Sequence, residues 1–116
     1  MDNFERLTDE ENVIMSIFTK LLKETNHLSR NVIIFPSNIQ EGKMIIDKSD
    51  YKWIFYIYER GKVFGYKEYD NLYSLCIDVF KSLDKDSTDY CMDVFVPLVE
   101  DLMNNEFNQK KMIKLN

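Results

Sequence analysis

The sequence predicts an α+β fold: an N-terminal helix, an antiparallel four-stranded meander, and two C-terminal helices packed on the sheet. Three observations lead to this prediction. Apolar residues recur at helical spacing near both ends of the chain, a strongly apolar segment from Tyr51 to Glu68 contains one sharp reversal, and the connections between the expected strands are short. A chain of 116 residues buries about two-thirds of its unfolded surface, so we expect residues 1–116 to form a single domain.

The first helix is predicted from its start signal and its apolar stripe. Thr8 and Glu11 stand at the spacing of a capping box, in which each side chain accepts a hydrogen bond from the other residue's backbone amide. The apolar residues that follow are spaced for one helical face: Val13, Ile14, Ile17, Phe18, Leu21 and Leu22. We expect this helix to end near Thr25-Asn26, with Leu28 packing just beyond it.

Two short strands are predicted next. Val32 to Phe35 is a β-branched run that Pro36 stops, which favours an edge strand. Lys43 to Asp47 gives a second strand after a stretch of turn residues. Because the connections between all four expected strands are too short for parallel crossovers, we expect the whole sheet to be antiparallel.

The long apolar segment supplies the other two strands. From Trp53 to Tyr58 both faces are apolar, so this strand should be central and covered on both faces. The chain then reverses at Glu59-Arg60-Gly61-Lys62, where Gly61 can supply the positive φ that a tight hairpin needs. Val63 to Tyr69 completes the meander.

Two helices are expected after the sheet. Asp70 is the predicted N-cap of the first, whose apolar residues are Leu72, Leu75, Cys76, Val79, Phe80 and Leu83. The second is expected to start at Thr88, and Pro97 should kink or split it. The tail, residues 107–116, fits either a last strand or a docked arm.

Charge and composition narrow the classes of partner. The net charge of −5 argues against nucleic acid as a direct ligand. Residues 84–106 hold seven acids and one base, Lys85, so one segment concentrates negative charge and a basic partner would complement it. The acidic, polar N-terminus and the short apolar runs predict a cytoplasmic protein without a membrane segment.

Chemistry-bearing residues are few. Cys76 and Cys91 are expected to be reduced and buried, and with a single histidine, His27, they do not suffice for a structural metal site. His27 fits the favourable dipole at a helix C-terminus. A Cys–His nucleophilic pair would need His27 beside one of the cysteines. The three glycines form no phosphate-binding loop, so we predict no cofactor and no enzymatic activity.

A protein-binding surface is the remaining prediction. The seven tyrosines and the acidic segment suggest recognition of a partner, although half of the tyrosines could be ordinary sheet residues and the acids a solvated helix face. We expect Tyr56 and Tyr58 to belong to the core. The predicted contact residues are Glu59, Tyr66, Tyr69, Asp84, Asp86, Asp89, Tyr90 and Asp93. For Glu59 the alternative is a local charge pair with Arg60 in the turn.

The pattern Trp53-x-Phe55-x-Ile57-x-Glu59-Arg60-Gly61, followed by Phe64 and the helix from Leu72 to Leu83, resembles small cytoplasmic immunity proteins of bacterial polymorphic toxin systems. The resemblance covers residues 51–83. Where such proteins open the helix with an acidic residue and an alanine, this chain has Asp70-Asn71-Leu72-Tyr73. The resemblance implies a protein that binds a cognate, basic toxin domain and neutralises it by stoichiometric occlusion. The alternative is an acidic secretion chaperone that forms a homodimer through the Pro97 helix and binds an effector segment.

Overall fold

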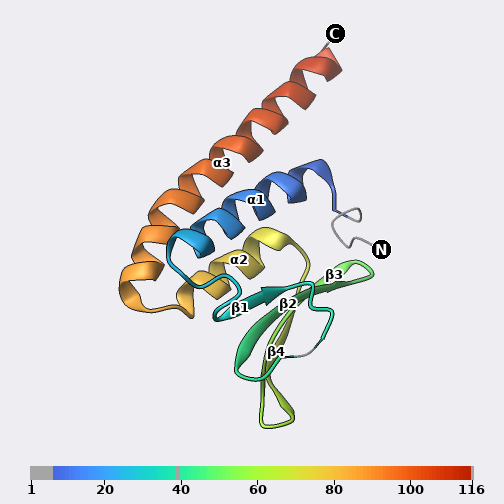
Figure 1. The fold of residues 1–116 in the computed structure, drawn as a ribbon. Helices are drawn as coiled ribbons and strands as arrows, with labels where there is room; N and C mark the ends of the chain where they lie inside the picture. Colours follow the sequence, from blue (N-terminus) through green and yellow to red (C-terminus); the bar gives the residue numbers. More distant parts are fainter. Residues whose placement is uncertain (1–6, 39, 116) are drawn as a thin grey trace.

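The computed structural model describes residues 7–38 and 40–115, with side chains through Asn104. This part of the chain forms three helices and one four-stranded sheet, and the α+β prediction is confirmed (Figure 1). In chain order the elements are α1 (Asp9–Glu24), β1 (Val32–Ile34), β2 (Lys43–Ser49), β3 (Lys52–Glu59), β4 (Lys62–Tyr69), α2 (Leu72–Lys81) and α3 (Lys85–Leu115).

The sheet follows the order β1-β2-β3-β4, and β2, β3 and β4 pair antiparallel as predicted. The prediction of a wholly antiparallel sheet is wrong at one edge, because β1 pairs parallel with β2, Val32 opposite Met44. The connection between β1 and β2 was expected to be too short for a parallel crossover, but β1 is itself very short. A strand of three residues is only about 10 Å long, so residues 35–42 suffice to carry the chain back to its starting end.

Strand β3 lies between β2 and β4, as expected of the most apolar strand. The three helices lie together on one side of the sheet (Figure 1), and Trp53 and Phe55 are buried on that side. The other face, which carries Ile54, Tyr56 and Tyr58, is only half-buried, so the predicted cover on both faces is wrong. Tyrosine explains the error, because its ring packs against neighbouring strands while its hydroxyl reaches water.

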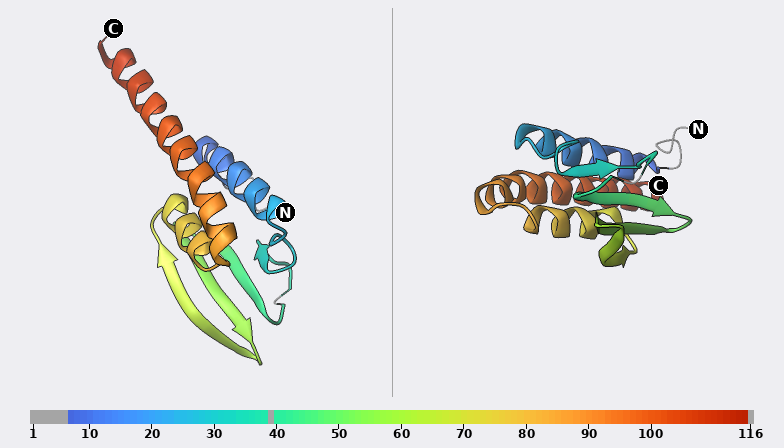
Figure 2. Two further views of the ribbon diagram at one scale, coloured as in Figure 1. Left: turned by 90° about the vertical axis from the view of Figure 1, so that its left-hand side faces the viewer. Right: turned by 60° about the horizontal axis from the view of Figure 1, so that its bottom comes forward.

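The β3–β4 hairpin reverses where predicted. Arg60 and Gly61 have φ values of 52° and 73°, and positive φ at both central positions is the pattern of a type I′ turn. Gly65, with φ of 62°, lies at a shift in the register between β3 and β4, so it marks a β-bulge. The hairpin extends beyond the helices (Figure 2), and β4 is exposed from Lys62 to Glu68.

The core joins the three helices to the inner face of the sheet. Helix α2 contacts β3 and β4 directly, and α1 and α3 pack against it. Phe80 on α2 stands at the centre, with its ring centroid 5.1 Å from that of Phe18 on α1 and 5.1 Å from that of Phe95 on α3. Cys76 and Cys91 are buried and free, as predicted.

The start of α2 differs by one residue from the prediction. Asn71 is the N-cap, and its side chain accepts a hydrogen bond of 2.8 Å from the backbone amide of Ser74. Asp70 instead forms an ion pair with Lys52 at the start of β3. Both Asp and Asn are good N-caps, so the sequence alone could not choose between the two neighbours.

The last helix, α3, is longer than predicted. It begins at Lys85 rather than Thr88, because the carboxylate of Asp84 accepts the backbone amide of Ser87 and so caps it. It continues unbroken past Pro97 to Leu115, so the predicted split is wrong, and so is the strand predicted as one alternative for residues 107–116, of which Asn116 lies outside the described residues. Pro97 is exposed, and water can therefore replace the backbone hydrogen bond that proline removes.

Candidate protein-binding surface

The predicted acidic contacts gather on the exposed face of α3. Asp86, Asp89, Asp93 and Glu100 are separated by three, four and seven positions, which places them on one side of the helix, and all four are exposed. We call these four residues the acidic stripe. At 1.5 Å per residue the stripe runs for about 21 Å. Only Asp89 is in an ion pair within the described part of the chain, with Lys85 at 3.1 Å.

Tyr90 lies beside the acidic stripe and is 44% exposed. Its hydroxyl donates a hydrogen bond to the carboxylate of Glu24 at the end of α1. This bond to a carboxylate, with partial desolvation, raises the pKa of the Tyr90 hydroxyl. Tyr90 therefore joins α1 to α3 and remains partly exposed at the surface.

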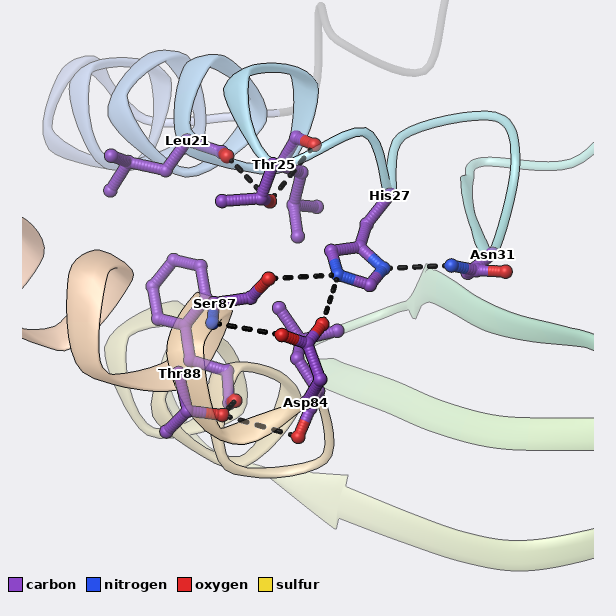
Figure 3. A network of polar contacts seen from close by, with 10 residues as sticks. Leu21, Thr25, His27, Asn31, Asp84, Ser87 and Thr88 are labelled. Atoms are coloured by element: carbon purple, nitrogen blue, oxygen red, sulfur yellow. Dashed lines mark hydrogen bonds and ion pairs between the residues drawn. The ribbon is translucent and has the colours of Figure 1, made fainter.

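Asp84 belongs to a network of polar contacts that closes the end of the helical layer (Figure 3). The imidazole Nε2 of His27 lies 3.1 Å from Asp84 Oδ1 and 3.3 Å from Ser87 Oγ, and its Nδ1 lies 2.7 Å from Asn31 Nδ2. The Nδ2 amide nitrogen of Asn31 can only donate, so His27 Nδ1 accepts and Nε2 carries the proton that Asp84 accepts. The backbone amide of Ser87, followed by its hydroxyl and by His27, lowers the pKa of Asp84.

The His27 network holds two loops together. It joins the loop after α1 to the loop before α3, which lie 57 positions apart in the sequence. Although it contains Ser, His and Asp, the hydroxyl and the carboxylate both contact Nε2, whereas a nucleophilic relay places them on opposite ring nitrogens. His27 is thus a structural connector here, and its 13% exposure fits that role.

The predicted contacts on the sheet are divided. Glu59 is exposed at the end of β3, and Tyr66 on β4 is 52% exposed, with its ring stacked on Tyr56 at a centroid distance of 6.3 Å. Tyr69 is half-buried and its hydroxyl donates to Asp78 on α2 at 2.5 Å. Burial and this bond raise the pKa of Tyr69 well above its ordinary value. Tyr69 therefore faces the helices rather than solvent.

The structure thus brings five predicted residues together and leaves three apart. Asp84, Asp86, Asp89, Tyr90 and Asp93 lie at and after the start of α3, whereas Glu59, Tyr66 and Tyr69 belong to the hairpin. Sequence reasoning missed Glu100, although its position seven residues after Asp93 places it on the same face.

A groove of about 340 Å³ opens where α1 and α2 begin. Its lining includes Glu11, Asp70, Tyr73 and Met103. Two of its carboxylates are already engaged, because Glu11 pairs with Lys48 and Asp70 with Lys52. Within the described residues no three His, Cys, Asp or Glu side chains gather closely enough to hold a metal ion.

Comparisons with known proteins give no relative. No protein-family model matches this chain, and no curated protein or solved structure does either. Among the described residues, no helix is both long and apolar enough to cross a membrane.

Proposed function

We propose that this protein is an immunity protein: it binds the basic face of a cognate toxin domain and neutralises it by covering that face in a one-to-one complex. The observation that carries the proposal is the acidic stripe. Four carboxylates on one side of a rigid helix, three of them without an ion pair among the described residues, form a linear negative surface. The resemblance of residues 51–83 to immunity proteins points to the same function.

The stripe suits fast capture of a basic partner. Unpaired surface charges of one sign raise the rate of encounter with a surface of the opposite sign, and this gain falls as salt screens the field. Because the carboxylates stand on a helix that packs on α1 and α2, they are held in position before binding. Little conformational entropy is then lost when the complex forms.

The partner is first identified by a pull-down with the tagged chain from its native lysate, washed at low and at high salt. The test is then the association rate of the triple variant Asp86→Asn, Asp93→Asn and Glu100→Gln with that partner. We expect the rate to fall about tenfold or more at low salt and to become less salt-dependent, with weaker protection of cells that express the partner. The matched control neutralises three exposed acids elsewhere: Asp9→Asn, Glu41→Gln and Asp50→Asn.

Equal association rates and equal protection for the two triple variants would contradict the proposal.

A second candidate, the homodimeric secretion chaperone, is favoured by one observation. Leu98 and Met103 on α3 are 49% and 44% exposed, and they place an apolar side chain on each flank of the buried side of that helix. Sedimentation velocity of the chain alone separates the two, since the chaperone requires a dimer whereas the inhibitor is active as a single copy.

A further inference from the structure

The sheet face away from the helices carries an ordered set of cross-strand rows. Pairing places Asp47 on β2 and Glu68 on β4 directly opposite Ile54 of β3, one on each side. In the next row Ile45 of β2 is opposite Tyr56. The ring of Tyr66 stacks on Tyr56 with an interplanar angle of 23°.

This face combines partly exposed apolar side chains with two carboxylates. Ile54 and Tyr56 are half-buried, and Ile45 in the same row as Tyr56 is fully buried outside the main core. The charge of Glu68 also acts on Lys52, whose ammonium pairs with Asp70. Within the described part of the chain neither Asp47 nor Glu68 is in an ion pair. Among these residues no helix or strand covers the face, since all three helices lie on the other side of the sheet (Figure 1).

From these contacts we infer that the outer sheet face binds an arginine side chain of the partner protein, held between the Asp47 and Glu68 carboxylates and stacked on the Tyr56–Tyr66 pair. We call these four residues the tyrosine–carboxylate site. The inference rests on the proposed function in one respect: the protein that carries the arginine is the basic partner proposed above. The recognition itself is testable without that partner.

The geometry of the site suits a planar cation. Asp47 and Glu68 lie on strands two spacings apart, about 10 Å between backbones, so both side chains can converge on a group above Ile54 or Tyr56. The hydroxyl of Tyr66 donates to Glu68 Oε2 at 3.0 Å, which fixes the direction of that carboxylate. A guanidinium can stack on a tyrosine ring and donate from two edges at once. The compact ammonium of lysine cannot do both.

The test uses hexa-arginine and hexa-lysine peptides as probes. The protein is the full chain carrying the stripe substitutions Asp86→Asn, Asp93→Asn and Glu100→Gln, so that general attraction to α3 is reduced. Binding is measured by titration with amide chemical shifts as the readout. We expect hexa-arginine to bind about fivefold tighter than hexa-lysine, with shifts concentrated at Ile54, Tyr56 and Tyr66.

Three substitutions test whether the preference for hexa-arginine over hexa-lysine arises at the tyrosine–carboxylate site. Asp47→Asn, Glu68→Gln and Tyr66→Leu should each weaken hexa-arginine binding about threefold or more and bring its affinity close to that of hexa-lysine. The matched controls are Tyr51→Leu and Asp50→Asn, an exposed tyrosine and an exposed acid in the β2–β3 turn. They should leave both affinities unchanged.

Equal affinity for the two peptides, or shifts confined to α3, would overturn the inference. So would a concentration-dependent dimer in which the signals of Ile54 and Tyr66 change without peptide, because the face would then belong to a second copy of this chain. The experiment contains no toxin. A failure of the proposed function, seen as an unchanged association rate for the stripe variant, is therefore distinguishable from a failure here.

Discussion

At the scale of single residues, Glu11 connects the first helix to the sheet. Its Oε1 accepts the backbone amide of Thr8 and the ammonium of Lys48 on β2, both at 3.0 Å, and its Oε2 accepts the indole N–H of Trp53 on β3 at 2.8 Å. The ammonium of Lys48 also lies 5.2 Å from the centre of the Trp53 ring. The capping box predicted from the sequence is present, and the Glu11 carboxylate of that box also binds side chains of the sheet.

Replacing Glu11 by Gln should lower the free energy of unfolding by about 1–3 kcal/mol at pH 7, because Lys48 is 13% exposed and would lose its carboxylate partner. Burial opposes ionisation of Glu11, but the bonds from Thr8, Trp53 and Lys48 outweigh it and lower its pKa below the ordinary 4.5. The unfolded state therefore binds the proton first as pH falls.

It follows that this stabilisation is complete above about pH 5, declines below pH 4.5 and is lost as pH falls through the pKa of the folded state. Urea unfolding of wild type and Glu11→Gln between pH 3 and 7 measures this, with the exposed Asp101→Asn as control. A difference between the two proteins that stays constant over that range would refute the assignment.

At the scale of elements, local signals in the sequence predict most of the fold. A capping box and an apolar stripe specify α1, a second stripe specifies α2, and Gly61 specifies the β3–β4 turn. The errors occur where the structure is determined by a contact distant in the sequence or by exposure to solvent. The parallel β1–β2 pair depends on a strand only three residues long, and the continuity of α3 depends on Pro97 facing water.

Pro97 makes α3 less stable than its length suggests. Proline in a helix interior removes one backbone hydrogen bond and costs about 3 kcal/mol relative to alanine. Since Pro97 is exposed, Pro97→Ala removes little packing, and it should raise the free energy of unfolding by about 2–3 kcal/mol. Asn104→Ala, an exposed control on the same helix, should raise it by no more than about 0.7 kcal/mol. If the Pro97 substitution destabilises the protein in urea unfolding, the helix requires a bend at this position.

At the scale of the whole molecule, the candidate sites depend on which faces the packing leaves open. The sequence predicts exposed acids after Asp84, but the contact of Asp84 with His27 requires two loops far apart in the chain to meet. The row of Asp47, Ile54 and Glu68 carries a weaker signal. Counting outward from the two-residue turn at Asp50 and Tyr51 pairs Asp47 with Ile54, but the bulge at Gly65 shifts the count for Glu68.

The shared core should also make the chain unfold as one unit. Phe80 contacts Phe18 and Phe95 from the other two helices, and the same core continues to Trp53 in the sheet. Phe80→Leu should therefore lower the free energy of unfolding by about 1–3 kcal/mol through the cavity it leaves, without changing the number of transitions. Far-UV circular dichroism follows the helices and Trp53 fluorescence follows the sheet.

For wild type and variant alike, we expect the two signals to give one midpoint in urea, with the variant's midpoint lower in both. Separate midpoints would mean that the helices and the sheet unfold independently. In that case the acidic stripe and the tyrosine–carboxylate site would belong to two units rather than one rigid body. The two surfaces would then not keep a fixed relative position for binding a single partner. A common midpoint instead means that both surfaces are fixed by one folding equilibrium. In urea, where Phe80→Leu lowers the folded fraction, partner binding at both surfaces should then fall together with that fraction.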